Sequence, residues 1–153
     1  MVVAASRDGL SPSYLHLYRN GVVELVDASI LNHRMTSHPD LRYIPSLGVE
    51  RLIVTGVERG LGLMRHIGGS APVAVTFALT DVKGMVLIFD DRWELFEHHP
   101  VLNTHLFFPD AIMLEVTDRI GPLLRPLFDL LFNACGIDQS PGFDAHGDWR
   151  GWQ

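Results

Sequence analysis

The chain has 153 residues, 47% apolar and 20% charged, with a mean hydropathy of +0.16. This composition predicts one folded domain with a hydrophobic core and excludes an intrinsically disordered chain. No apolar run approaches the roughly 18 residues that a membrane-spanning helix needs, and the N-terminus does not have the pattern of a signal peptide. We therefore expect a soluble, cytoplasmic protein with no membrane partner.

Charge is distributed unevenly along the chain. The formal net charge is −6, from 12 basic and 18 acidic residues. Residues 1–76 carry 7 basic and 6 acidic groups, whereas residues 77–153 carry 5 and 12. Because nucleic-acid affinity comes mainly from cationic side chains, the acidic second half is a poor candidate for binding nucleic acid. The near-neutral first half leaves that function open through its arginines, namely Arg19, Arg34, Arg42 and Arg51.

The first predicted element is a β-hairpin. Residues 14–19 alternate between two faces, and residues 22–27 form a second strand-like run after Asn20-Gly21. Asn-Gly is the strongest short hairpin signal, because a two-residue turn of this kind needs positive φ at both positions. Residues 28–43 show little periodicity and predict a loop.

A long helix is expected next. Apolar residues between positions 47 and 67 recur with a period near 3.6, residue 45 or 46 can begin the helix, and the glycines at 68–69 can end it. Small residues at Gly56 and Gly60 would let another element approach the helix closely.

Short strands and a second helix follow. Residues 72–80 predict a buried strand with residues 85–89 as its hairpin partner, and further strands are expected at 106–108 and 111–116. The second helix is expected over residues 119–134. Its predicted N-cap is Asp118, and its C-terminal glycine is Gly136.

This order of elements, ββ-α-ββ-β-α, implies an α+β domain. We expect an antiparallel sheet of about five to six strands with two long helices packed mainly on one face. Residues 1–13 would form an N-terminal extension, residues 14–136 the single domain, and residues 137–153 a tail docked on it through residues such as Trp149.

Eight histidines are a high count for this length, so a metal site must be considered. The densest group lies in the polar segment 90–110, with His98, His99, His105 and Asp110 as candidate ligands. Adjacent histidines point apart in an extended chain, and the spacing from 99 to 105 matches no common zinc pattern. A solvated loop is therefore favoured, and a metal-dependent hydrolase that uses this loop is the alternative.

No other pattern indicates catalysis. A nucleotide-binding P-loop, a dinucleotide-binding fingerprint and a Gly-x-Ser-x-Gly motif are all absent from the sequence. Cys135, the single cysteine, lies at the end of an apolar helical pattern and is interpreted as a small buried hydrophobe. We therefore expect no catalytic residues and no cofactor.

Three stretches, at residues 15–24, 44–51 and 125–149, resemble a known kind of domain. They are similar to the C-terminal domain of bacterial proteins that carry an N-terminal Schlafen/AlbA-type domain, to which DNA binding is attributed. The resemblance covers about residues 14–150 and is weakest at about 81–113. It implies an accessory domain without the nucleic-acid-binding domain.

The sequence thus predicts a non-catalytic accessory domain of a bacterial regulatory or defence-type system. It would act as a sensor or as a protein-interaction or oligomerisation module, with a protein partner or a second copy as its ligand and a dimer favoured. Candidate interaction residues are Tyr18, Arg19, Arg51 and Trp93. Candidate structural residues are Asn20, Gly21, Asp118, Gly136 and Trp149.

Overall fold

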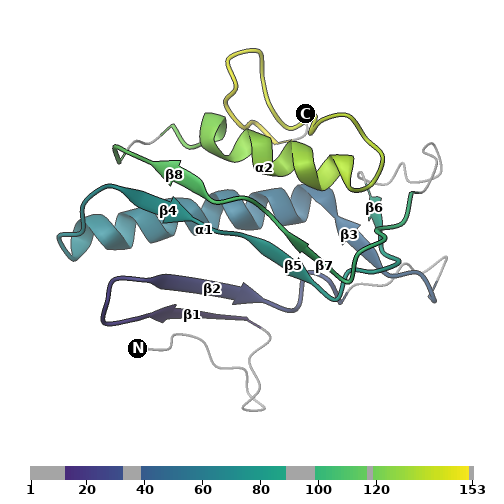
Figure 1. Ribbon diagram of the computed structural model, residues 1–153, viewed down its shortest axis with the longest axis horizontal. Coiled ribbons are helices and arrows are strands. Elements are labelled where there is room, and N and C mark those ends of the chain that lie inside the picture. The colour runs from purple at the N-terminus through teal and green to yellow at the C-terminus, as the bar shows by residue number, and fades with distance from the viewer. Residues whose placement is uncertain (1–12, 33–38, 89–98, 117–118, 152–153) are drawn as a thin grey trace.

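The computed structural model describes residues 13–32, 39–88, 99–116 and 119–151 (Figure 1). These residues contain two α-helices and several short β-strands, which confirms the α+β class. The helices are α1, Ser46–His66, and α2, Gly121–Asn133. The strands are β1, Ser13–Leu17; β2, Val23–Asp27; β3, Tyr43–Pro45; β4, Val73–Val75; β5, Ala78–Thr80; β6, Val86–Ile88; β7, His105–Phe107; and β8, Ala111–Met113.

The expected single sheet of five to six strands is not confirmed. Among the described residues the strands pair two by two, as β1–β2, β3–β6, β4–β8 and β5–β7. Three of these pairs are antiparallel, but β3 and β6 run parallel. Strands of three to five residues make short ladders, so the core depends on their packing against the helices.

The predicted pairing of residues 72–80 with 85–89 is wrong. The chain does not reverse between β5 and β6, because this segment continues the ladder with residues 101–104: Val82 N–H donates to Thr104 O at 2.9 Å, and Val101 N–H donates to Met85 O at 2.8 Å. The turn signals there instead reflect two residues with positive φ, Asp81 at 56° and Gly84 at 78°.

The antiparallel pairs β4–β8 and β5–β7 form one long ribbon, because β4 leads into β5 and β7 leads into β8. Across the junction, Phe108 N–H donates to Phe77 O at 3.2 Å, and the two rings stack with their centroids 4.4 Å apart. We call these four strands and their junction the ribbon. In Figure 1 it crosses in front of α1 and below α2.

Helix α1 begins at Ser46, as predicted, and the buried Ser46 hydroxyl donates to Ile88 O at 2.7 Å, which ties the helix start to β6. The helix ends at His66, and Gly68 follows with a φ of +76°. Gly56 allows β2 to approach α1 closely, as its small size predicted, since a Cβ at this position would lie 2.7 Å from Leu25 Cδ2. A Cβ at Gly60, by contrast, would meet nothing within 4 Å.

The hairpin β1–β2 forms as predicted, but its turn differs. Gly21 N–H donates to Tyr18 O at 3.1 Å and Tyr18 N–H donates to Val22 O at 2.9 Å, so three residues close the loop. Only Gly21 has positive φ in this loop, at +87°. Three-residue hairpin loops combine a type I turn with one left-handed glycine, so Asn20 needs no unusual φ.

Helix α2 begins at Gly121, slightly later than expected, and no side chain caps its first turn. Asp118, the predicted cap, lies outside the described residues. A Cβ at Gly121 would lie 2.6 Å from Gly147 O, so glycine is needed where the tail passes close to the helix. Gly136 follows the helix with a φ of +78°, a conformation that glycine adopts readily.

The core lies where both helices meet the inner face of the ribbon. Phe128 and Leu124 of α2 are fully buried against Val54 and Leu61 of α1 and Met113 of β8. A second cluster joins the end of α2 to β3 and β6 through residues that include Ile44, Leu87, Leu131, Phe132 and Cys135. The helices therefore cover one face of the ribbon, and its opposite face is not part of either cluster.

Candidate interaction surface

The outer face of the ribbon exposes several large apolar side chains. Residues along each strand of the ribbon alternate between its inner and outer faces, because successive side chains of a strand point to opposite sides. Val73, Val75, Phe77 and Leu79 point inward, while Ala74, Thr76 and Ala78 between them point outward. On the opposite strands the outward side chains include Phe107, Ile112 and Leu114, which are 78%, 52% and 77% exposed.

Outward side chains differ in size between the two sides of the ribbon. The side formed by β4 and β5 carries only small ones, namely Ala74, Thr76, Ala78 and Thr80. The side formed by β7 and β8 carries the large ones, His105, Phe107, Ile112 and Leu114. In the register of the ladders, Ala74 is the partner of Ile112, Ala78 of Phe107, and Thr80 of His105. We call these eight residues, with Asp110, the outer face.

Asp110 is the one acidic residue of the outer face. It is exposed and lies with Pro109 at the junction of β7 and β8, where Thr76 and Phe77 are the residues of the opposite strand between the two ladders. A mostly uncharged face with large exposed apolar side chains is typical of a protein–protein contact surface, since aromatic and aliphatic anchors supply most of the binding energy there.

This surface was not predicted from the sequence, because the apolar run of residues 72–80 is typical of one buried strand. Alanine and threonine were counted with the apolar residues, which hid the alternation of large inward and small outward side chains. The period-two change in side-chain size between Val73 and Thr80 was the signal that could have revealed a half-exposed strand.

Two of the predicted interaction residues lie together at the tip of the hairpin. Tyr18 donates its hydroxyl proton to Glu24 Oε2 at 3.0 Å and stacks on His16, with ring centroids 4.1 Å apart. The hydrogen bond to Glu24 and partial burial raise the pKa of Tyr18. Arg19 is exposed in the adjoining loop, whereas Arg51 is exposed on α1. Trp93 lies outside the described residues.

Arg42, another arginine of the proposed nucleic-acid surface, is paired within the fold. Arg42 forms an ion pair with Asp81, with 3.0 Å between Nη2 and Oδ2, and also donates to Asp81 O at 2.9 Å. Arg34 lies outside the described residues. The cation of Arg42 is therefore neutralised within the fold.

Of the described candidate metal ligands, His105 and Asp110 belong to the outer face of the ribbon, whereas His99 lies at the end of α2. His105 accepts a hydrogen bond at Nδ1 from Asp81 N–H at 3.4 Å, at the start of β7. His99 packs at the end of α2, where a Cβ at Gly136 would lie 2.7 Å from its ring. Within the described part of the chain, no group of three or more His, Cys, Asp or Glu side chains could hold a metal ion. His98 lies outside this part.

Glu50 anchors the C-terminal tail to α1 from inside the protein. Its side chain is fully buried, Oε2 accepts a hydrogen bond from Trp149 Nε1 at 2.9 Å, and Oε1 accepts one from the Ser140 hydroxyl. Gly142 leaves room for this carboxylate, since a Cβ there would lie 2.6 Å from Oε2. These donors satisfy a group that is costly to bury unpaired.

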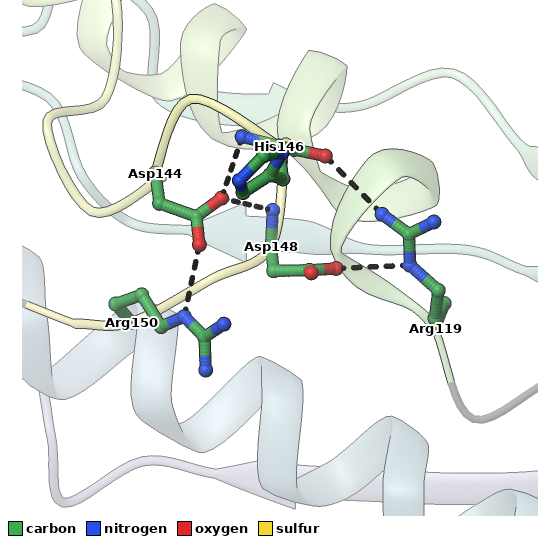
Figure 2. Close-up of polar contacts among 5 residues, drawn as sticks. All are labelled: Arg119, Asp144, His146, Asp148 and Arg150. Carbon is green, nitrogen blue, oxygen red and sulfur yellow. Dashed lines mark hydrogen bonds and ion pairs between the residues drawn. The ribbon is translucent and has the colours of Figure 1, made fainter.

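A second polar cluster closes the tail loop, as Figure 2 shows. Asp144 Oδ1 accepts hydrogen bonds from the backbone N–H groups of His146 and Asp148 at 2.9 and 3.0 Å, and Oδ2 accepts one from Arg150 Nε at 3.0 Å. Asp148 in turn pairs with Arg119, with 3.2 Å between Oδ1 and Nε. Each carboxylate has an arginine partner, so the cluster fixes the loop and offers no unneutralised charge to a ligand.

Hydrogen bonding in this loop changes the acidity of Asp144. The side-chain hydrogen bond from Arg150 and the backbone N–H groups of Asp148 and His146 lower its pKa from 3.8 to about 2. These donors favour the charged form.

Cys135 is buried in the cluster that joins α2 to β3 and β6. Burial raises the pKa of its thiol from 9.0 to about 11. A thiol in this state is a poor nucleophile at neutral pH, since the thiolate is the reactive form.

Comparisons with known proteins identify no relative of this chain. No family model matches the chain, and no curated protein or solved structure is significantly similar to it. No helix among the described residues has the length and apolar character needed to cross a membrane.

Proposed function

We propose that this protein is a non-catalytic accessory domain that acts through protein contacts, as a sensor or interaction module, and that the outer face of the ribbon is its contact surface. The observation that carries the proposal is the exposure of Phe107, Ile112 and Leu114 on one continuous face. Side chains of this size lose favourable burial energy when they stay in water, about 25 cal/mol per Å² of apolar area.

The polar groups of the described residues support the same function. Every buried side-chain polar atom of the described residues has a hydrogen-bond partner, so none of them marks an empty ligand site. The conspicuous polar groups of the tail are used to hold it in place. The resemblance to the C-terminal domain of Schlafen/AlbA-type proteins also supports an accessory role in a bacterial regulatory or defence-type system.

The test combines the mass of the purified protein with pull-downs from the source cells. The wild-type chain is expected to form an oligomer or to retain a defined protein. A double variant, Phe107→Ser with Leu114→Ser, should lose that association by at least tenfold, because a few large anchors supply most interface energy. Leu130→Ser, on the exposed face of α2, is the matched control and should keep it.

A wild-type chain that stays a strict monomer and retains no protein would overturn the proposal. An association that the Phe107/Leu114 variant keeps would overturn the assignment of the surface.

A further inference from the structure

We infer that the partner on the outer face is a second copy of this chain, stacked face to face with a twofold axis parallel to the ribbon strands. This inference rests on the proposed function, because it names the partner of the same surface. Its basis is the division of the face into one row of small and one row of large side chains.

A twofold axis parallel to the strands exchanges the two rows. It lays the β7–β8 side of one copy over the β4–β5 side of the other, at the same level along the strands. Each large residue that has a ladder partner therefore faces the small partner of its counterpart: Ile112 faces Ala74 of the second copy, and Phe107 faces Ala78. Packed sheets exclude voids best when large and small side chains interdigitate in this way.

An axis that runs across the strands gives a worse fit. It would lay large residues on large residues and leave the alanines facing alanines, with a gap between them. Twofold interfaces must be complementary to themselves, so the arrangement of sizes selects the axis parallel to the strands.

Charge supports the same arrangement. Each copy carries a formal net charge of −6, so contacts rich in carboxylates repel each other. The outer face has only Asp110, and the inferred axis lays its β7–β8 side over the β4–β5 side of the second copy, so the two Asp110 carboxylates do not face each other. A basic partner would instead be expected on a face with several carboxylates.

Pairing along the ribbon edges is less favourable than stacking of the faces. Pro72 precedes β4, and Pro109 separates β7 from β8, and both are exposed. Proline has no N–H to donate to an added strand, so it interrupts a ladder along these edges.

The test exchanges the two residues of one ladder pair. Ala74→Ile should weaken the dimer at least tenfold, since the new side chain meets Ile112 of the second copy. Ile112→Ala should weaken it at least fivefold through lost burial. The double variant restores one large and one small side chain at each contact and should bind within about threefold of wild type. Sedimentation equilibrium measures the dissociation constants, and Leu130→Ala is the control.

We expect the double variant to restore dimerisation. This can happen only if both contacting surfaces carry the substitutions, as they do in a dimer of this chain. A partner other than this chain keeps its shape, so the double variant would then bind no better than the single variants, which would overturn the inference. If the wild-type chain is a monomer but retains another protein through Phe107 and Leu114, the second copy is excluded and the proposed function stands. If it does neither, both fail.

Discussion

Trp149 donates its indole proton to the buried carboxylate of Glu50 at 2.9 Å, across 99 positions of the sequence. This hydrogen bond ties the tail to the middle of the domain. Replacing Trp149 with phenylalanine keeps an aromatic ring but leaves Glu50 Oε2 without this donor. A hydrogen bond to a charged group contributes about 1.5–3 kcal/mol, so we expect Trp149→Phe to lower the free energy of unfolding by at least about 1 kcal/mol.

Urea denaturation followed by circular dichroism measures this change. Arg150→Gln, which alters the exposed part of the same tail, is the comparison and should destabilise less, because exposed ion pairs contribute little. Equal losses in the two variants would contradict the role of Glu50 as the anchor.

Acid stability depends on Asp144. Its pKa is about 2 in the folded protein and 3.8 in an unperturbed chain. Because the folded value is the lower one, the ionised carboxylate stabilises the fold fully above about pH 4, and this contribution is lost as the pH falls toward 2. We expect Asp144→Asn to lower the melting temperature at pH 6 and to flatten its decline between pH 4 and 2.

The variant Arg150→Gln separates the effect of Arg150 on the pKa of Asp144 from that of the backbone N–H groups, since it removes the largest contribution to the low pKa. Between pH 4 and 2 the melting temperature of this variant should decline less in total than that of wild type and level off at a higher pH, because the folded pKa of Asp144 is then closer to 3.8. A decline of the same size that ends at the same pH would show that the backbone donors alone set the acidity.

Alanine substitutions at two glycines of α1 test how closely the hairpin β1–β2 packs against this helix. Gly60→Ala should raise the free energy of unfolding by about 1 kcal/mol, because alanine favours the helix and a Cβ meets nothing within 4 Å there. Gly56→Ala should give a smaller gain or a loss, since its Cβ would lie 2.7 Å from Leu25 Cδ2. Thermal unfolding of both variants measures the difference, and equal gains would contradict the close contact of hairpin and helix.

Cys135 should be protected in the folded protein. With a pKa of about 11, only about one thousandth of the thiol is ionised at pH 8, and the side chain is buried. We expect a thiol reagent at pH 8 to label it at least a hundredfold more slowly in buffer than in urea. Rapid labelling in buffer would show that the end of α2 opens.

The sequence allowed the helices and the hairpin to be predicted, because these elements depend on local signals. The 3.6-residue period, Pro45-Ser46 and the glycines after each helix lie close to the residues that they control. The pairing of β6 was not predictable in this way. It joins residues 43–45 to residues 86–88, and no local pattern distinguishes this parallel partner from a hairpin.

The candidate surface was harder to predict than the fold. Leu106 and Phe107 are consecutive apolar residues, yet only the ladder with β5 determines that Phe107 points outward. Similarly, Glu50 looks like an ordinary solvated position of an amphipathic helix, and its burial depends on donors about 90 to 99 residues later. Such relationships follow from tertiary packing, which overrides local preference.

The most direct test of the contact surface is photo-cross-linking from position 107. The chain is produced in its source cells with p-benzoylphenylalanine in place of Phe107, whose side chain is 78% exposed, or in place of Leu130 as the control. We expect illumination to give a discrete protein adduct from position 107, of about twice 17.1 kDa for a second copy, and none from position 130. Absence of any adduct from position 107, or equal adducts from both positions, would contradict the account.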